Sequence, residues 1–301
     1  MPLDFYLDYA EWFQRRKSIQ PTRDLVTRLD GTADHGFLAT LASGDTIAAR
    51  RIVLALGFGA FQHIPTELAA ILPDGRYGHT CDEVALDRFA GKRVLIIGGR
   101  QSAYEWAALL READVATVHI SHRHSRPAFA VADWSWVGPL VGGMTTNPGW
   151  YRRLPAEAQT AICQRLNGEG RLKLEPWLEP RVERDGIHVW PKTTLASCTT
   201  TSSGDLSATF DNGQSVTVDH LILATGYKVQ IDRLPLLRDG NILPKLATQD
   251  GFPVLDERFQ TSVPGFHITS MPATRDFGPF FAFTIAARAS AQVIGAHLAT
   301  A

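Results

Sequence analysis

The chain has 301 residues and a formal net charge of −1, with 20% of its residues charged. This length accommodates two domains of ordinary size, and the near-neutral charge gives no support for nucleic acid or an acidic membrane surface as a partner. No apolar run approaches the roughly 18 to 20 residues that a membrane-spanning helix needs. Cys81, Cys163 and Cys198 form no C-x-x-C pair, which argues against a dithiol redox centre and favours reduced thiols in a cytoplasmic protein.

The N-terminal segment interleaves aromatic and acidic residues and predicts an amphipathic helix. An antiparallel meander should follow, because β-rich runs alternate with turn residues and the last run ends in a buried strand before Gly57. The predicted strands are 24–29, 36–41 and 46–56.

Residues 91–124 form the most informative stretch. An apolar strand at 94–97, a turn at Gly98 and Gly99, and apolar residues at helical spacing over 101–111 predict a strand–turn–helix unit. Backbone N–H groups at such a helix start attract phosphate, and this order is typical of a dinucleotide site. The alternative is an ordinary turn of another α/β fold.

The turn departs from the usual G-x-G-x-x-G/A fingerprint at one position. Gly98 and Ala103 match the first and last small residues, whereas Arg100 replaces the second glycine. A phosphate must therefore sit differently here or meet the Arg100 guanidinium itself. Gln101 and Ser102 complete the turn.

The end of the next predicted strand, 115–120, indicates which dinucleotide is bound. An NAD site places Asp or Glu about 20 residues beyond the glycines, but here His122 and Arg123 follow Ser121. Because Arg123 can clamp a 2′-phosphate that a carboxylate would repel, we expect NADPH rather than NADH. The alternative is a solvated basic loop. His119, His122 and His124 lack a nearby acid or cysteine, so we predict no metal site.

The second half repeats the order of the first, with a meander that leads into a strand ending in glycine. A long apolar helix over 280–298 should close the chain, opened by Gly278 and Pro279. The other predicted elements are a helix at 155–166, strands at 181–190, 207–210, 215–218, 219–227 and 263–268, and a turn at 211–213.

Together these pieces resemble the NADPH-using flavin-dependent monooxygenases, which include flavin-containing monooxygenases and ornithine and lysine N-hydroxylases. The matching segments are QHIP (62–65), YGHT (77–80), GGRQSA (98–103), ATGY (224–227) and the terminal GPF helix. The resemblance implies an α/β fold with a Rossmann-like NAD(P)-binding domain (91–226) inserted in an incomplete FAD-binding domain with antiparallel β-meanders (1–90 and 227–301).

The resemblance also implies residues and chemistry. Hydride would pass from NADPH to FAD, and oxygen to a small substrate bearing N, S or a carbonyl; no catalytic residue is indicated. The expected cofactor contacts are Gly98, Gly99, Gln101, Ser102 and Ala103 at the NADPH pyrophosphate, Arg100, His122 and Arg123 at phosphate charge, Thr225, Gly226 and Tyr227 at the junction of the cofactors, and a helix start at Phe277, Gly278 and Pro279 beside the flavin.

The sequence departs from the family at the site that binds FAD. Family members begin with a G-x-G-x-x-G loop that holds FAD, and no such loop precedes Gly98 in this sequence. We therefore expect weak FAD retention. Two alternatives stay open: a non-enzymatic NADPH-binding remnant or subunit, and a flavin-dependent reductase that does not oxygenate. A homo-oligomer is also open.

Overall fold

The computed structural model describes residues 3–34 and 36–300, and the chain divides into two compact units. One unit comprises the residues up to Ile52 together with Asp232–Lys245, and the other comprises Val53–Ile231 and the residues from Leu246 onward. The division predicted from the sequence, into 1–90, 91–226 and 227–301, describes cofactor-binding domains and not compact units, so it stays a prediction.

The first unit contains the predicted N-terminal helix and the predicted meander. Its sheet has the order β1-β2-β3 with antiparallel pairs, and its core includes Leu29 and Phe37. Asn241 fixes one end of β1, because its side chain accepts from Gly31 N (2.8 Å) and donates to Gly31 O (3.1 Å). The elements are α1 (Leu3–Arg16), β1 (Val26–Gly31), β2 (Phe37–Leu41), β3 (Thr46–Ala49) and α7 (Pro235–Arg238).

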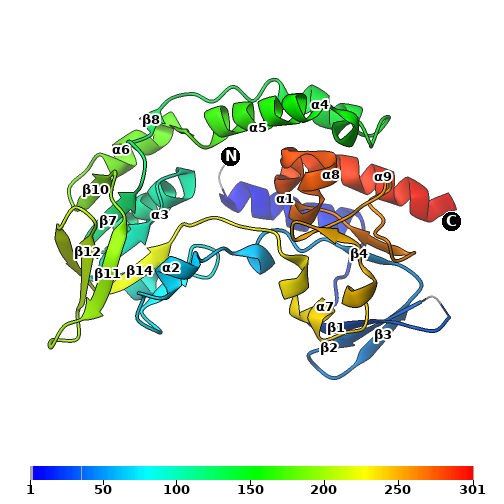
Figure 1. Cartoon of the computed structure of the whole chain (residues 1–301), viewed down its shortest axis with the longest axis horizontal. Helices are drawn as coiled ribbons and strands as arrows, with labels where there is room; N and C mark the ends of the chain where they lie inside the picture. Colours follow the sequence, from blue (N-terminus) through cyan, green and yellow to red (C-terminus); the bar gives the residue numbers. More distant parts are fainter. Residues whose placement is uncertain (1–2, 35, 301) are drawn as a thin grey trace. The chain divides into compact units, whose positions relative to one another are not determined.

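The second unit is built on a parallel five-stranded sheet of order β10-β7-β6-β14-β5 (Figure 1). All four neighbouring pairs run parallel, as the buried apolar runs at 94–97 and 221–223 predict. The strands are β5 (Tyr77–His79), β6 (Arg93–Ile97), β7 (Thr117–His122), β10 (Ile187–Pro191) and β14 (His220–Leu223).

Alternate residues of the central strand β6 face two different layers. Val94 and Ile96 pack with α3 (Gln101–Glu112), whereas Leu95 packs with an antiparallel sheet on the other face. Figure 1 shows α3 and strands β11 and β12 beside the parallel strands. That second sheet consists of β11 (Leu195–Thr200), β12 (Leu206–Phe210) and β13 (Ser215–Val218), with the predicted turn between β12 and β13.

Within the described part of the chain, no helix is long and apolar enough to cross a membrane. The remaining elements are α2 (Thr66–Ala69), α4 (Val137–Gly143), α5 (Ala156–Gly170), α6 (Glu179–Val182), α8 (Thr274–Phe277), α9 (Ala287–Thr300), β4 (Ile52–Leu54), β8 (Ala128–Phe129), β9 (Lys173–Leu174), β15 (Thr248–Gln249), β16 (Phe252–Pro253) and β17 (Phe266–Ile268).

Two strand predictions were wrong in extent. The predicted strand 46–56 is two strands, because β3 pairs with β2 while β4 belongs to a different sheet with β17. The predicted strand 181–190 begins too early: Pro180 lies in the first turn of the short helix α6, where its fixed φ suits a helix start, and β10 begins only at Ile187.

The predicted helix over 280–298 was also wrong in its start, and with it the helix start at Phe277, Gly278 and Pro279. Gly278 has φ of +102° and follows the four-residue helix α8; irregular 3-10 turns occupy 279–282 and 284–286 before α9 begins. Packing explains the difference, since Phe277 stacks on Phe259 with 3.7 Å between ring centroids. Burial of these aromatic rings overrides the local helical pattern.

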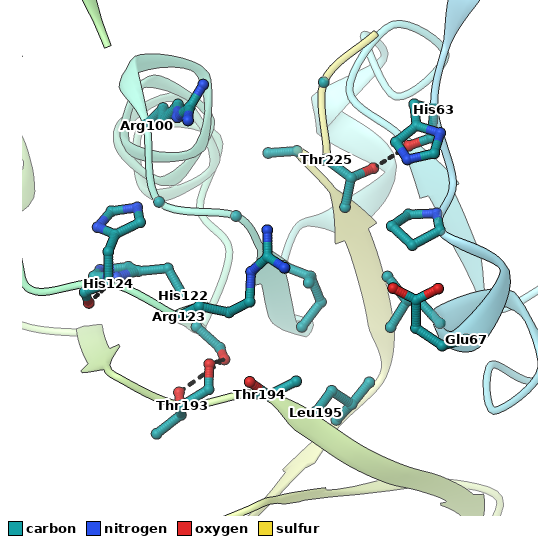
Figure 2. Close-up of a pocket in the computed structure, with 18 of the residues that line it drawn as sticks. His63, Glu67, Arg100, His122, Arg123, His124, Thr193, Thr194, Leu195 and Thr225 are labelled. Carbon is teal, nitrogen blue, oxygen red and sulfur yellow. Dashed lines mark hydrogen bonds between the residues drawn. The ribbon is translucent and has the colours of Figure 1, made fainter. Parts of the chain in front are cut away.

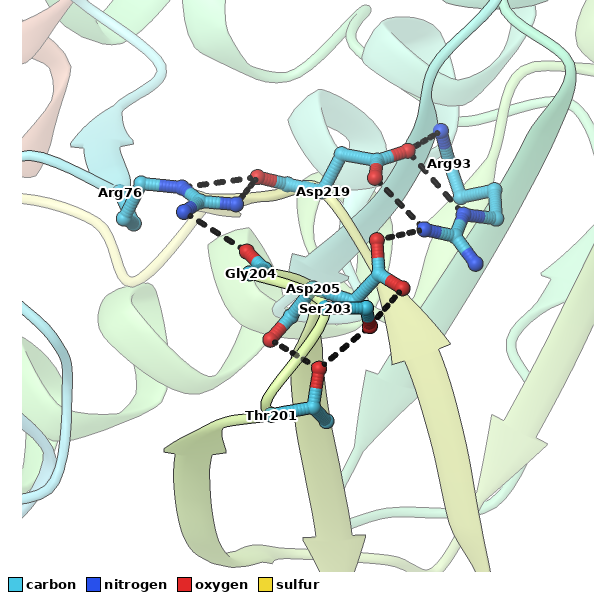
Figure 3. A network of polar contacts seen from close by, with 7 residues as sticks. All are labelled: Arg76, Arg93, Thr201, Ser203, Gly204, Asp205 and Asp219. Atoms are coloured by element: carbon cyan, nitrogen blue, oxygen red, sulfur yellow. Dashed lines mark hydrogen bonds and ion pairs between the residues drawn. The ribbon is translucent and has the colours of Figure 1, made fainter.

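A polar network ties the antiparallel sheet to the parallel one (Figure 3). Arg93, at the start of β6, donates to Asp219 Oδ1 (2.6 Å) and to Asp205 Oδ1 (2.7 Å). Arg76 donates to the backbone carbonyls of Asp219 (3.0 Å) and Gly204 (3.1 Å). Two arginines thus join the β11–β12 turn to two neighbouring strands.

Candidate functional site

A cavity of about 700 Å³ opens at the carboxyl ends of the parallel strands. It lies where β14 returns to the sheet between β6 and β5, which is a reversal of strand order of the kind where open α/β sheets bind ligands. The lining residues are His63, Pro65, Thr66, Glu67, Leu68, Ile71, Ile97, Gly98, Gly99, Arg100, Ser121, His122, Arg123, His124, Thr193, Thr194, Leu195, Ala196, Ala224, Thr225 and Gly226.

The glycine turn at the base of the cavity is required by its surroundings. Gly98 has φ of +143°, and a Cβ there would lie 2.8 Å from the Ala224 Cβ. Gly99 has an ordinary φ, but a Cβ would collide with the ring of His122. The turn therefore brings β6 close to β14 and to the end of β7, and α3 begins directly after it, with its N-cap residue Arg100 lining the cavity.

Three arginines from separate segments gather beside this turn. Arg100 is the N-cap residue of α3, Arg123 follows β7, and Arg171 follows α5. Burial lowers the pKa of Arg100 from its usual value, and repulsion from Arg171 and Arg123 lowers it further. Within residues 3–34 and 36–300, none of the three forms an ion pair. Figure 2 shows the Arg123 guanidinium extending into the middle of the cavity.

His122 forms a buried wall next to these cations. It is 4% exposed, and its pKa is lowered by burial, so the ring is neutral at neutral pH. Its Nδ1 lies 2.9 Å from the His124 carbonyl and therefore donates, which leaves Nε2 to accept from the Tyr104 hydroxyl at 3.1 Å. The His124 ring stacks on it at 4.4 Å between centroids.

The opposite wall is built from the loops after β14 and before α2. Thr225 Oγ1 donates to the His63 carbonyl (2.5 Å), and His63 N donates to the Gly226 carbonyl (2.9 Å). Glu67 is the single acid among the lining residues, and it lies on the side away from Arg100 (Figure 2). The cavity is thus cationic at one end and polar with one carboxylate at the other.

The predicted contact residues fall into four groups. Seven line the cavity: Gly98, Gly99, Arg100, His122, Arg123, Thr225 and Gly226. Tyr227 lies just beyond it, where its ring contacts Phe58 and His79, each at 5.1 Å between centroids. Gln101, Ser102 and Ala103 form the first turn of α3, and Phe277, Gly278 and Pro279 lie apart from the cavity near Tyr151.

Two residues of the α3 turn have structural contacts of their own. The Gln101 side chain donates to Glu105 Oε1 (2.7 Å) and accepts from Glu175 N (3.1 Å). Ala103 is fully buried against the parallel sheet, as the close helix–strand packing at that fingerprint position requires.

Sequence reasoning missed several residues of the cavity. Thr193 and Thr194 follow β10, and the end of the predicted strand 181–190 was an available signal, since parallel strands end at one edge. His63 belongs to the quoted segment QHIP but was not assigned to the site. Glu67 carries no local signal, because only the folded chain brings it to the cavity, and the same holds for Arg171, which lies near Arg100 without lining the cavity.

The closely spaced histidines do not converge on a point. His119 accepts a hydrogen bond from Trp190 Nε1 (3.1 Å), on the strand before the cavity, whereas His122 and His124 stack on each other. Within the described residues, no group of three or more His, Cys, Asp or Glu side chains is arranged to hold a metal ion.

Solved structures with the same architecture come from flavoproteins. L-Lysine 6-monooxygenase from Pseudomonas syringae aligns with a TM-score of 0.70 and 19% identity over 96% of this chain and 74% of its own. The ornithine N-hydroxylase of Kutzneria sp. 744, whose structure holds reduced FAD, NADP+ and L-ornithine, aligns with a TM-score of 0.76 and 17% identity over 99% and 77%. The chain has the fold of the two-dinucleotide-binding-domain flavoproteins.

Sequence comparison adds closer but shorter matches to this flavoprotein fold. The FAD-dependent urate hydroxylase of Xanthomonas campestris is 32% identical over 130 residues, 42% of this chain and 27% of the relative. The ferredoxin–NADP reductase of Ralstonia nicotianae is 35% identical over 159 residues, 50% of this chain and 43% of the relative. The chain therefore matches less than half the length of these relatives. No family model matches the chain.

The predicted resemblance to NADPH-dependent flavoprotein monooxygenases is confirmed by the fold, and the predicted α/β class with a parallel Rossmann-like sheet and antiparallel strands is confirmed as well.

Proposed function

We propose that the chain binds NADPH in the cavity at the carboxyl edge of the parallel sheet and serves an NAD(P)H-dependent flavoprotein oxidoreductase reaction of the monooxygenase kind. The observation that carries this proposal is the convergence of Arg100, Arg123 and Arg171, without ion-pair partners in the described chain, beside a glycine turn and a helix start. The three side chains are exposed to solvent and lie close enough to repel one another, so together they favour an anion, and NADPH brings several phosphate charges.

The cavity fits NADPH in its parts. The turn at Gly98 and Gly99 lines the cavity next to the start of α3, where helix N–H groups and the helix dipole would favour a pyrophosphate. Arg123, directly after β7, lies where the ribose 2′ position falls in this kind of site. The nicotinamide end would lie toward Thr225 and Gly226, beside Tyr227.

FAD fits the described residues less completely. Within residues 3–34 and 36–300, α3 is the only helix of eight or more residues that begins directly after a strand and a glycine turn. The described residues therefore provide this kind of phosphate grip for one dinucleotide, which we assign to NADPH. A bound flavin would accept hydride and carry the oxygen chemistry; its retention by this chain is expected to be weak.

The substrate class follows from the relatives. Enzymes that hydroxylate urate, lysine and ornithine support a small nitrogen-bearing or related substrate, and no residue is assigned as catalytic. What the chain itself contributes is the position of the nicotinamide and a wall of buried residues that excludes water.

A reductase that does not oxygenate is the second candidate. The match to ferredoxin–NADP reductases, at 35% identity over 159 residues, favours it specifically. The two candidates differ in their products: a monooxygenase yields an oxygenated substrate, whereas a reductase only passes electrons onward.

The test begins with nucleotide binding. Titration of the purified chain with NADPH and NADH, followed by fluorescence, should show clear preference for NADPH; equal or absent binding would overturn the assignment. Absorbance at flavin wavelengths measures retained FAD, and oxygen consumption with NADPH and added FAD measures turnover. Product analysis then separates the two candidates.

A second copy of the chain is the partner that we propose for α1. Phe5, Tyr9, Trp12 and Phe13 repeat at helical spacing and are between 41% and 60% exposed, and Tyr9 stacks on Trp12 at 5.7 Å. The acidic residues of α1 are Asp4, Asp8 and Glu11. They precede the basic residues Arg15 and Arg16 at the end of the helix and Lys17 just after it. In an antiparallel pair of such helices, the acids of one copy meet the bases of the other.

A cytoplasmic location also remains a proposal. Cys81, Cys163 and Cys198 are all free thiols, as is usual for proteins in a reducing compartment.

A further inference from the structure

Arg123 lies in a segment whose backbone is held on both sides. Thr193 N donates to the His122 carbonyl (3.0 Å), and Lys192 N donates to the His124 carbonyl (3.1 Å). Arg123 itself, between these two anchors, sends its side chain into the cavity (Figure 2). The contacts that fix His122 and His124 therefore also set the direction of the Arg123 guanidinium.

The His122 ring supplies the closest of these restraints. Its Nδ1–H donates to the His124 carbonyl (2.9 Å) and so closes a loop around Arg123. This bond requires the tautomer with hydrogen on Nδ1, and that tautomer leaves Nε2 without hydrogen. The Tyr104 hydroxyl, 3.1 Å away, donates to Nε2 and so favours the same tautomer.

Tyr104 connects this loop to the phosphate end of the site. It is 0% exposed and belongs to α3, the helix that begins at the glycine turn. His122 touches that turn as well, since its ring fills the space where a Gly99 side chain would lie. The Tyr104–His122 hydrogen bond thus joins the pyrophosphate turn to the Arg123 segment in one buried unit.

We propose that Tyr104 and His122 are positioning residues that hold Arg123 for the 2′-phosphate and thereby set the preference for NADPH over NADH. This inference rests on the proposed NADPH site. Neither residue needs to touch the nucleotide. Their effect comes from fixing the segment in advance, which lowers the entropy that Arg123 loses when it binds phosphate. His122 stays neutral at neutral pH because burial lowers its pKa, so the ring remains an acceptor for Tyr104.

The test compares two nucleotides that differ by one phosphate, adenosine 2′,5′-bisphosphate and 5′-AMP, by calorimetric titration of the purified chain. Tyr104→Phe should weaken binding of the bisphosphate by about three- to tenfold, because the hydroxyl that holds His122 Nε2 and contacts Arg126 is lost, and it should change binding of 5′-AMP by less than about twofold. Tyr77→Phe, on β5 and outside the cavity lining, is the matched control and should change neither.

A double-mutant cycle separates positioning from general loosening. If Tyr104 acts through Arg123, then Tyr104→Phe should have no further effect on bisphosphate binding in the Arg123→Ala background. Equal weakening of both nucleotides, or the same loss with and without Arg123, would overturn the inference. Thermal unfolding of each variant shows that it is folded. Should the unaltered chain bind both nucleotides equally, the NADPH assignment would fall and this inference with it.

Discussion

Gly98 lies directly against Ala224, so that a Cβ at position 98 would come within 2.8 Å of the Ala224 Cβ and closer still to its carbonyl oxygen. The contact joins the ends of β6 and β14 at the floor of the cavity. Together with a φ of +143°, it leaves glycine as the residue that this position accommodates without strain.

Gly98→Ala should therefore abolish measurable NADPH binding and lower the free energy of unfolding by about 1 to 3 kcal/mol or more. Urea unfolding and nucleotide titration measure the two effects. Gly142→Ala is the control, because Gly142 lies in α4 with no atom within 4 Å of the added Cβ; its stability should stay the same or rise by up to about 1 kcal/mol. Normal binding by Gly98→Ala would show that the turn is not the phosphate site.

Arg123→Ala should weaken the binding of NADPH by about 10- to 100-fold and the binding of NADH by less than about threefold, because a charge-assisted contact to the 2′-phosphate is lost. Arg258→Ala removes an exposed arginine distant in sequence and outside the cavity lining, and should leave both affinities unchanged. An equal loss for NADPH and NADH would place Arg123 on the pyrophosphate instead. Fluorescence titration with each nucleotide at one salt concentration distinguishes these results.

The parts of the fold that the sequence predicts well are those with strong local patterns. The strand, glycine turn and helix from Arg93 to Glu112 and the hairpin turn at 211–213 lie where their residues indicate. Strand β11 was missed because its exposed positions carry small residues, alanine, serine and threonine, which give little hydrophobic signal. The start of α9 was misplaced because tertiary packing of Phe277 on Phe259 governs that segment.

The candidate site shows the same division. Gly98, Arg100 and Arg123 stand in one local unit and could be named from it. Arg171 and Thr193 follow a helix and a strand far along the chain, and they reach the site only through the order of strands and the path of α5. Long-range arrangement of this kind is not encoded in the spacing of neighbouring residues.

The ion pairs of Arg93 should make the free energy of unfolding depend on pH in the acidic range. Hydrogen bonds from Arg93 hold the pKa of Asp219 below its usual 3.8. This contribution is therefore complete above the unfolded value and is lost as the pH falls through the lower, folded value. Asp219→Asn should cost about 1 kcal/mol at pH 7, since the pair is partly exposed, and the difference from the unaltered chain should shrink toward pH 3.

Urea unfolding at pH 7, 5 and 3 measures this trend. Asp74→Asn changes an exposed carboxylate outside the network of Figure 3 and should leave the unfolding free energy within about 0.5 kcal/mol at each pH. A cost for Asp219→Asn that stays constant from pH 7 to 3 would contradict an origin in the charge of Asp219.

Antiparallel pairing of α1 between two copies predicts how association responds to charge. Reversing two of the three acids, with Asp4→Arg and Asp8→Arg, places like charges opposite one another and should weaken the dimer at least about tenfold. Adding Arg15→Asp and Arg16→Asp restores opposite charges in the reversed order and should restore association. Light scattering across a range of concentrations, repeated at high salt, measures both effects, and salt should reduce them.

Replacing the aromatic stripe tests the apolar part of the same contact. Phe5→Ser with Trp12→Ser should give a monomer with helix content close to that of the unaltered chain, because both side chains are about half exposed and contribute little to the folded unit itself. Phe283→Ser, at an exposed aromatic residue outside α1, is the control and should leave association unchanged. If the unaltered chain is monomeric at high concentration, or if the charge-restored variant remains monomeric, then α1 does not pair with its own copy. Binding of the chain to lipid vesicles through α1 would assign the apolar face of this helix to a membrane surface instead.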